Sequence, residues 1–214
     1  MKLICIGRNY TAHIEELANE RPDEPVVFIK PDSAVLPKEQ DFYIPEFSDD
    51  IHYEVEVLVK IKKVGKHIEK KFAHTYYDEI GLGIDFTARD LQSALKEKGL
   101  PWEKAKGFDG AAVIGKWLSK DRFKDTNNLN FSLWKNGKEV QKGNTSLMLW
   151  KIDELISYVS TYFTLKKGDI ILFDEFNVPM HEFKAFSEWV QTNYIKYEVL
   201  ASVNNFYQVA MVLK

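Results

Sequence analysis

The chain has 214 residues, a formal net charge of −3, a pI near 6.0 and 45% hydrophobic residues. This length and apolar content predict one sizeable globular domain, and the mildly acidic charge gives no electrostatic reason to expect nucleic acid or a membrane surface as a partner. The single cysteine excludes an internal disulfide, and no apolar run approaches the roughly 20 residues that span a bilayer. We therefore expect a cytoplasmic protein.

Short apolar strands and few helices are predicted for the first half of the chain. Ile14 and Leu17 are spaced to share one face of a helix, and Pro37 and Pro45 interrupt any regular structure around them. In chain order we expect a strand at 2–6, a helix at 10–19, a strand at 26–29, a loop-rich stretch at 32–50, strands at 54–61 and 80–86, and a helix at 88–98.

The second half is also predicted to be rich in strands. Asn136-Gly137 is a favoured two-residue turn between alternating strands, so a hairpin is expected at 131–140. A helix at 152–163 and a strand at 170–173 follow, and the last predicted elements are a helix at 180–192 and strands at 195–203 and 206–213. This succession predicts an α+β, β-rich mixed fold.

Three carboxylates stand out because of their place in apolar runs. Glu54 and Glu56 alternate with valines, so their side chains point to the same side of one strand. Two like charges on one face are unfavourable unless a cation lies between them. Asp85 ends a second apolar run and would supply a third oxygen, which suits Mg²⁺ or Mn²⁺. The alternative for Glu54 and Glu56 is the solvated face of an edge strand.

A histidine and a glutamate on the first predicted helix form a second candidate group. His13 and Glu16 are three residues apart and would share one helix face, so the glutamate could orient the imidazole as a general base that activates water. The alternative is an ordinary surface pair.

Cationic and amide side chains near the carboxylates are candidates for binding an anion. Arg89 follows Asp85 by four residues and Gln92 lies three residues further, so both would project from the start of one helix. Lys106, among apolar and small residues, and Lys30, before a proline, could hold an anionic substrate. Most lysines in such loops are simply solvated.

Several of these segments, taken in order, resemble the fumarylacetoacetate hydrolase family over about residues 2–172, and most closely its small acylpyruvate hydrolase and oxaloacetate decarboxylase members. The matching motifs are Gly7-Arg8-Asn9-Tyr10 with His13 and Glu16, Phe28-Ile29-Lys30-Pro31, Glu54-Val55-Glu56, Asp85 to Gln92, and Gly99-Leu100-Pro101-Trp102 with Ala105-Lys106. Because several independent motifs occur in the right order, the resemblance is specific.

The resemblance implies a mixed β-roll, a homodimer, and Mg²⁺ or Mn²⁺ held by Glu54, Glu56 and Asp85. It also implies a lid-like N-terminal helix that carries His13 and Glu16. Arg89, Gln92 and Lys106 would contact a keto-acid substrate, and Lys30 and Tyr10 are added to this predicted substrate-binding set. His13, Glu16 and Lys106 form the predicted catalytic set. The implied reactions are hydrolysis of the carbon–carbon bond of acylpyruvates and decarboxylation of oxaloacetate, both through a pyruvate enolate.

The resemblance stops after residue 172. Members of the family usually continue with a Thr-Gly-Thr-Pro loop, whereas this chain continues with Phe173-Asp174-Glu175-Phe176-Asn177. Residues 173–214 resemble the closing strand–helix–strand–strand of class I methyltransferases, but no glycine-rich nucleotide loop precedes them. We therefore expect a catalytic domain at 1–172 and an atypical segment at 173–214 packed on it. Two alternatives stay open: a catalytically impaired protein that binds metal and keto acid, and a chain whose β-roll is left incomplete.

Overall fold

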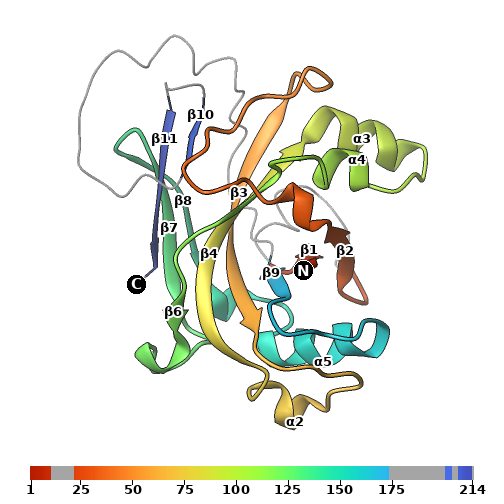
Figure 1. The fold of residues 1–214 in the computed structure, drawn as a ribbon, viewed down its shortest axis with the longest axis vertical. Helices are drawn as coiled ribbons and strands as arrows, with labels where there is room; N and C mark the ends of the chain where they lie inside the picture. Colours follow the sequence, from red (N-terminus) through yellow and green to blue (C-terminus); the bar gives the residue numbers. More distant parts are fainter. Residues whose placement is uncertain (11–21, 174–200, 204–206, 214) are drawn as a thin grey trace.

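The computed structural model describes residues 1–10, 22–173, 201–203 and 207–213 (Figure 1). Within these residues the chain forms a large seven-stranded sheet and a smaller four-stranded sheet. The strands of the large sheet are β1 (Leu3–Gly7), β2 (Val26–Lys30), β3 (Ile51–Ile61), β4 (Tyr77–Ala88), β5 (Ala112–Ile114), β6 (Leu118–Ser119) and β9 (Ile170–Phe173). Their order is β2-β1-β9-β3-β4-β5, with β6 also paired to β4.

The smaller sheet contains β7 (Asn130–Lys135), β8 (Lys138–Asn144), β10 (Ala201–Val203) and β11 (Tyr207–Leu213), in the order β10-β11-β7-β8. Asn136 and Gly137 both have positive φ, 51° and 76°, as the tight turn between β7 and β8 requires, so the predicted hairpin is confirmed. β11 runs antiparallel to β7. The last strands of the chain therefore extend the sheet that the hairpin begins.

The described part of the chain contains four short helices: α2 (Lys70–Ala73), α3 (Arg89–Glu97), α4 (Glu103–Lys106) and α5 (Ile152–Tyr162). Figure 1 shows α3 and α4 together beyond the end of β4, with α5 and α2 near its opposite end. Single 3₁₀ turns lie at Asp32–Ala34, Lys120–Arg122 and Thr145–Leu147. A mixed sheet with few helices agrees with the predicted α+β fold class. No helix among the described residues has the length and apolar character to cross a membrane.

The two faces of the large sheet carry different kinds of side chain. Val55, Val57 and Val59 of β3 enter the main hydrophobic core, which also contains α5 and the hairpin strands. Alternation places Glu54, Glu56 and Leu58 on the opposite face. Leu58 packs there in a second, smaller cluster with Cys5 and Leu172. The acidic side chains therefore lie on the face away from the main core.

Some predicted element boundaries differ from the structure. β3 begins at Ile51 and β4 spans Tyr77–Ala88, because the antiparallel pairing continues past the start of the first predicted run and past both ends of the second. The backbone of Tyr10 forms an isolated bridge with Met148, so a helix does not begin at Tyr10 as predicted. The rest of that predicted helix, 11–19, and the predicted helix at 180–192 lie outside the described residues.

Gly83 is required where β4 passes closest to its neighbours. A Cβ atom at this position would lie 2.6 Å from the Val113 carbonyl oxygen and 2.8 Å from Leu58 Cδ1. Gly83 is also the register partner of Glu56. A side chain here would therefore push β4 away from β5 directly beside one of the carboxylates.

We predict that Gly83→Ala destabilises the fold by roughly 1–3 kcal/mol, the usual cost of overpacking a well-packed interior. Gly81→Ala is the matched control, because it lies on the same face of β4 and its nearest contact would be a looser 3.1 Å. Urea unfolding of both variants measures the difference. Equal losses of stability would contradict the close-approach argument.

Candidate metal centre

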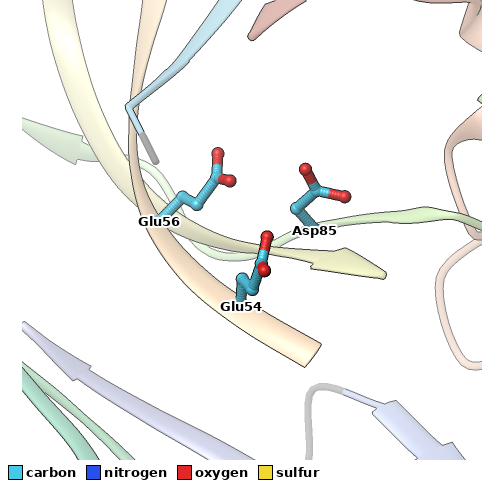
Figure 2. A group of neighbouring side chains, drawn as sticks. All are labelled: Glu54, Glu56 and Asp85. Carbon is cyan, nitrogen blue, oxygen red and sulfur yellow. The ribbon is translucent and has the colours of Figure 1, made fainter. Parts of the chain in front are cut away.

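Three buried carboxylates meet on the strand pair β3–β4. Glu54 is the register partner of Asp85, and Glu56 lies two residues further along β3. Side chains at such positions project from the same face of the sheet. One carboxylate oxygen from each residue can be chosen so that all three lie within 4.8 Å of one another (Figure 2). Glu54 is 2% exposed, and Glu56 and Asp85 are 0% exposed.

This donor set fits a hard divalent cation. Its ligand atoms are all carboxylate oxygens, the type that Mg²⁺ and Mn²⁺ prefer. Two oxygens that each lie about 2.1 Å from Mg²⁺ can be at most about 4 Å apart, so small side-chain movements would bring this group to binding distance. Three protein ligands also leave coordination positions for water or substrate. The residues therefore fit the metal that the resemblance implies.

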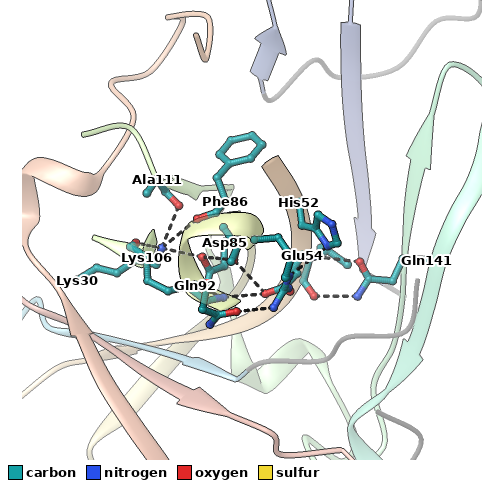
Figure 3. Close-up of polar contacts among 12 residues, drawn as sticks. Lys30, His52, Glu54, Asp85, Phe86, Gln92, Lys106, Ala111 and Gln141 are labelled. Atoms are coloured by element: carbon teal, nitrogen blue, oxygen red, sulfur yellow. Dashed lines mark hydrogen bonds and ion pairs between the residues drawn. The ribbon is translucent and has the colours of Figure 1, made fainter. Parts of the chain in front are cut away.

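The ammonium of Lys106 lies between two of the carboxylates. Lys106 is the last residue of α4, and its Nζ is 2.9 Å from Glu54 Oε2 and 2.9 Å from Asp85 Oδ2 (Figure 3). Its side chain is 4% exposed. In so dry a place the ammonium offsets repulsion between the carboxylates that would otherwise disfavour burying them.

Lys30, at the end of β2, forms an ion pair with the other carboxylate oxygen of Asp85. Its Nζ is 2.6 Å from Asp85 Oδ1, and its side chain is 0% exposed. The same ammonium donates hydrogen bonds to the carbonyl oxygens of Lys106, Ala111 at 3.2 Å and Phe86 at 3.5 Å. Lys30 thus ties the loop after α4 to the carboxylate site, and its contact with substrate stays a prediction.

Arg89 and Gln92 come to the site from the first turns of α3. The Arg89 Nη2 atom donates to Glu54 Oε1, and Nη1 donates to Gln92 Oε1 at 2.6 Å. Ser48 and the backbone N–H of Asp49 donate hydrogen bonds to Asp90, which anchors the start of the helix. The spacing of three residues therefore places both predicted side chains beside the carboxylates.

His52 and Thr87 also contact this group, although neither is among the predicted site residues. The Arg89 Nε–H donates to His52 Nδ1 at 3.3 Å, and His52 Nε2 lies 3.1 Å from Asp50 Oδ1. Burial and the Arg89 charge lower the pKa of His52, which favours the neutral imidazole that this hydrogen bond requires. The Thr87 hydroxyl lies 3.4 Å from Glu54 Oε2. Two-residue spacing from Glu54 and Asp85 is the signal that could have found them.

The N-terminal motif is anchored beside residues 148–150. The buried Asn9 side chain accepts a hydrogen bond from the Trp150 N–H at 3.1 Å and donates one to the Trp150 carbonyl at 3.3 Å. Tyr10, which follows, is 1% exposed. Its predicted contact with substrate stays a prediction. His13 and Glu16 lie outside the described residues, so their roles stay predictions as well.

The formal charges of these side chains balance. Lys30, Lys106 and Arg89 form ion pairs with Glu54 and Asp85, and Glu56 completes the acidic group. Among the described residues, these six side chains therefore bring three positive and three negative charges into one region. A bound divalent cation would give the region a surplus of two positive charges, which is a favourable environment for an anionic ligand.

Curated proteins similar to this chain act on oxaloacetate. Oxaloacetate decarboxylase, mitochondrial, of Dictyostelium discoideum is 42% identical over 172 residues, which cover 80% of this chain and 79% of that protein. Oxaloacetate tautomerase YcgM of Escherichia coli is 38% identical over 172 residues, with coverage of 80% and 78%.

Solved structures show the same fold. A fumarylacetoacetate hydrolase family protein of Yersinia pestis superposes with a TM-score of 0.82 at 32% identity, covering 100% of this chain and 88% of that one. Fumarylpyruvate hydrolase of Pseudomonas aeruginosa, in complex with Mn²⁺ and pyruvate, gives a TM-score of 0.76 at 32% identity, with coverage of 81% and 77%.

The family model for the C-terminal region of fumarylacetoacetate hydrolase matches residues 2–173, close to the extent predicted from the motifs. It ends where the sequence departs from the usual loop, and the likeness of residues 173–214 to a methyltransferase stays a prediction. Together with the relatives and the shared fold, this match shows that the chain is an enzyme of the fumarylacetoacetate hydrolase family.

Proposed function

We propose that this chain is a divalent-metal-dependent enzyme that converts oxaloacetate, or a close 2-keto dicarboxylate, through the enolate of its keto group. The observation that carries the proposal is the group of Glu54, Glu56 and Asp85, whose oxygens converge within 4.8 Å in a buried region bordered by Lys106 and Arg89. The oxaloacetate decarboxylase and tautomerase among its relatives support the choice of substrate.

Glu54, Glu56 and Asp85 would hold the ion, and Mg²⁺ and Mn²⁺ are the candidates. The Mn²⁺ in the fumarylpyruvate hydrolase structure supports this assignment. When bound, a divalent ion supplies Lewis-acid stabilisation of negative charge on a keto oxygen. Lys30 and Thr87 would keep the ligand oxygens oriented, as partners of metal ligands generally do.

Lys106 and Arg89 would bind and orient the substrate. Both cations border the carboxylates in a largely dry environment, where a charge acts more strongly on its neighbours than it does in water. Gln92 and His52 limit the orientations of the Arg89 guanidinium by contacts at 2.6 and 3.3 Å. Lys106 Nζ also carries protons beside the site, so it could donate a hydrogen bond to an oxygen that gains negative charge.

Two reactions of oxaloacetate pass through an enolate with negative charge on the C2 oxygen, although the two enolates differ. In decarboxylation the C3–C4 bond breaks, CO₂ leaves, the bonding electrons form the enolate of pyruvate, and a proton later adds to C3. In tautomerisation a proton leaves C3 and another adds to the C2 oxygen. A site that stabilises negative charge on that oxygen therefore supports both reactions.

The charge balance favours a dianion. With three carboxylates, three cations and a divalent ion, the surplus of two positive charges is neutralised by the two carboxylates of oxaloacetate. A monoanion such as acetylpyruvate neutralises only half of the surplus. Residual charge is costly in a buried site, so the dicarboxylate is the better match.

Acylpyruvate hydrolysis is the second candidate, supported by the likeness to fumarylpyruvate hydrolase. It requires a water molecule activated by a base, a task that the resemblance assigns to His13 with Glu16. A catalytically impaired keto-acid-binding protein is the remaining alternative, because the usual substrate loop after residue 172 is replaced. A homodimer and a cytoplasmic location stay predictions, and curated relatives include mitochondrial proteins.

The proposal is tested with Mn²⁺ or Mg²⁺ by two readouts, pyruvate formation from oxaloacetate and the keto–enol conversion of oxaloacetate followed by the ultraviolet absorbance of the enol, each corrected for the reaction that the free metal catalyses without protein. We expect metal-dependent turnover, and a loss of at least about 100-fold in Glu56→Gln because a ligand charge is removed. Glu79→Gln is the matched control, since Glu79 lies on β4 and forms an ion pair with Lys60 at the surface. Full activity in Glu56→Gln would remove that residue from the site.

A second assay separates the candidate functions. We expect kcat/KM for oxaloacetate to exceed that for acetylpyruvate with the same metal, because the dianion completes the charge balance. A preference for acetylpyruvate, with release of pyruvate and acetate, would instead support hydrolysis. If neither compound is converted while oxalate plus Mg²⁺ raises the melting temperature, the binding-protein alternative replaces both.

A further inference from the structure

A glutamine from the smaller sheet binds the backbone between two of the carboxylates. Gln141 lies on β8 and is 2% exposed. Its Oε1 accepts a hydrogen bond from the Val55 N–H at 3.0 Å, and its Nε2 donates to the Val55 carbonyl oxygen at 3.2 Å (Figure 3). Val55 separates Glu54 from Glu56. The side-chain amide thus pairs with the peptide groups of the residue between them.

This contact lies at the part of β3 that no described strand pairs with along one edge. β4 pairs with β3 along its whole length, whereas β9 on the other side pairs only with Val57–Lys60 and ends at Phe173, opposite Val57. Val55 lies two residues beyond that end. Buried backbone groups without partners are costly, and the amide of Gln141 supplies both hydrogen bonds in place of a further residue of β9.

The β7–β8 hairpin contains a bulge next to Gln141. Leu133 pairs with Gln141, but the next residue, Trp134, pairs with Glu139, so Val140 is an extra residue in β8. Bulges of this kind re-aim side chains and are common beside active sites. The same hairpin makes a second polar contact with β3, because Lys135 Nζ donates to the Tyr53 hydroxyl at 3.1 Å. The hairpin therefore contacts β3 on both sides of Glu54.

We propose that Gln141 is a positioning residue of the metal centre. By fixing the peptide groups of Val55, it sets the directions in which Glu54 and Glu56 leave the strand, and hence the separation of their oxygens. This inference rests on the metal site of the proposed function. It predicts that the amide of Gln141 raises affinity for the ion without touching ion or substrate.

The test uses Gln141→Met, which keeps a side chain of similar length but has no amide. We expect Mn²⁺ to bind about 10-fold more weakly, measured by isothermal titration calorimetry well below the melting temperature, since loss of a supporting contact commonly costs this much affinity. Hydrogen exchange at the Val55 amide should also accelerate, and this second measurement needs no metal.

Thr145→Val is the matched control. Thr145 is buried and directly follows β8. Its hydroxyl also makes two hydrogen bonds to the backbone, accepting from the Leu129 N–H at 2.8 Å and donating to the Thr126 carbonyl at 3.0 Å. Those partners lie outside β3. We expect Thr145→Val to lower the melting temperature while leaving Mn²⁺ affinity and Val55 exchange at wild-type values.

The possible results distinguish failure of the proposed metal site from failure of the proposed role of Gln141. If the wild-type chain binds no Mn²⁺, the metal site is wrong and this inference falls with it. If the wild type binds Mn²⁺ and Gln141→Met binds it equally well, only the role of Gln141 is overturned. Should Gln141→Met fail to fold, Gln141→Asn, which keeps the amide on a shorter side chain, is measured in the same way with the same expected weakening.

Discussion

Three like charges are buried at one place in the sheet, and the residues around them are arranged to offset their repulsion. Glu54, Glu56 and Asp85 are at most 2% exposed, and their oxygens lie within 4.8 Å of one another. Carboxylates in such a place need cations. Lys30 from β2, Lys106 from α4 and Arg89 from α3 supply positive charge from three separate elements. Three separate elements therefore meet β3 and β4 at the point where the buried carboxylates need positive charge.

The charged site and the main hydrophobic core lie on opposite faces of β3. Valines on one face of β3 enter the main core with α5 and the hairpin, so burial of apolar surface stabilises the strand independently of its acidic face. The backbone carbonyls that accept from Lys30 belong to β4, to the last residue of α4 and to the loop after it, which couples Asp85 to the segment that carries Lys106. The polar site is thus built on rigid strands and completed by short helices.

Much of the site could be predicted from the sequence because its residues follow local rules. Alternation put Glu54 and Glu56 on one side of a strand, an apolar run marked Asp85, and a spacing of three residues linked Arg89 to Gln92. Other parts depend on contacts between distant segments. The burial of Lys30 requires the register of β2 against β1, and the position of Gln141 requires a bulge in β8. The role of His52 depends on its contact with Arg89, which lies 37 residues further along the chain.

The central claim is that Glu54, Glu56 and Asp85 together bind one divalent ion. Crystals of the wild-type chain soaked in Mn²⁺, with data collected near the manganese absorption edge, test it most directly. We predict an anomalous difference peak within coordination distance of all three side chains. A well-ordered site with no peak there, or a peak held by other residues, would contradict the account.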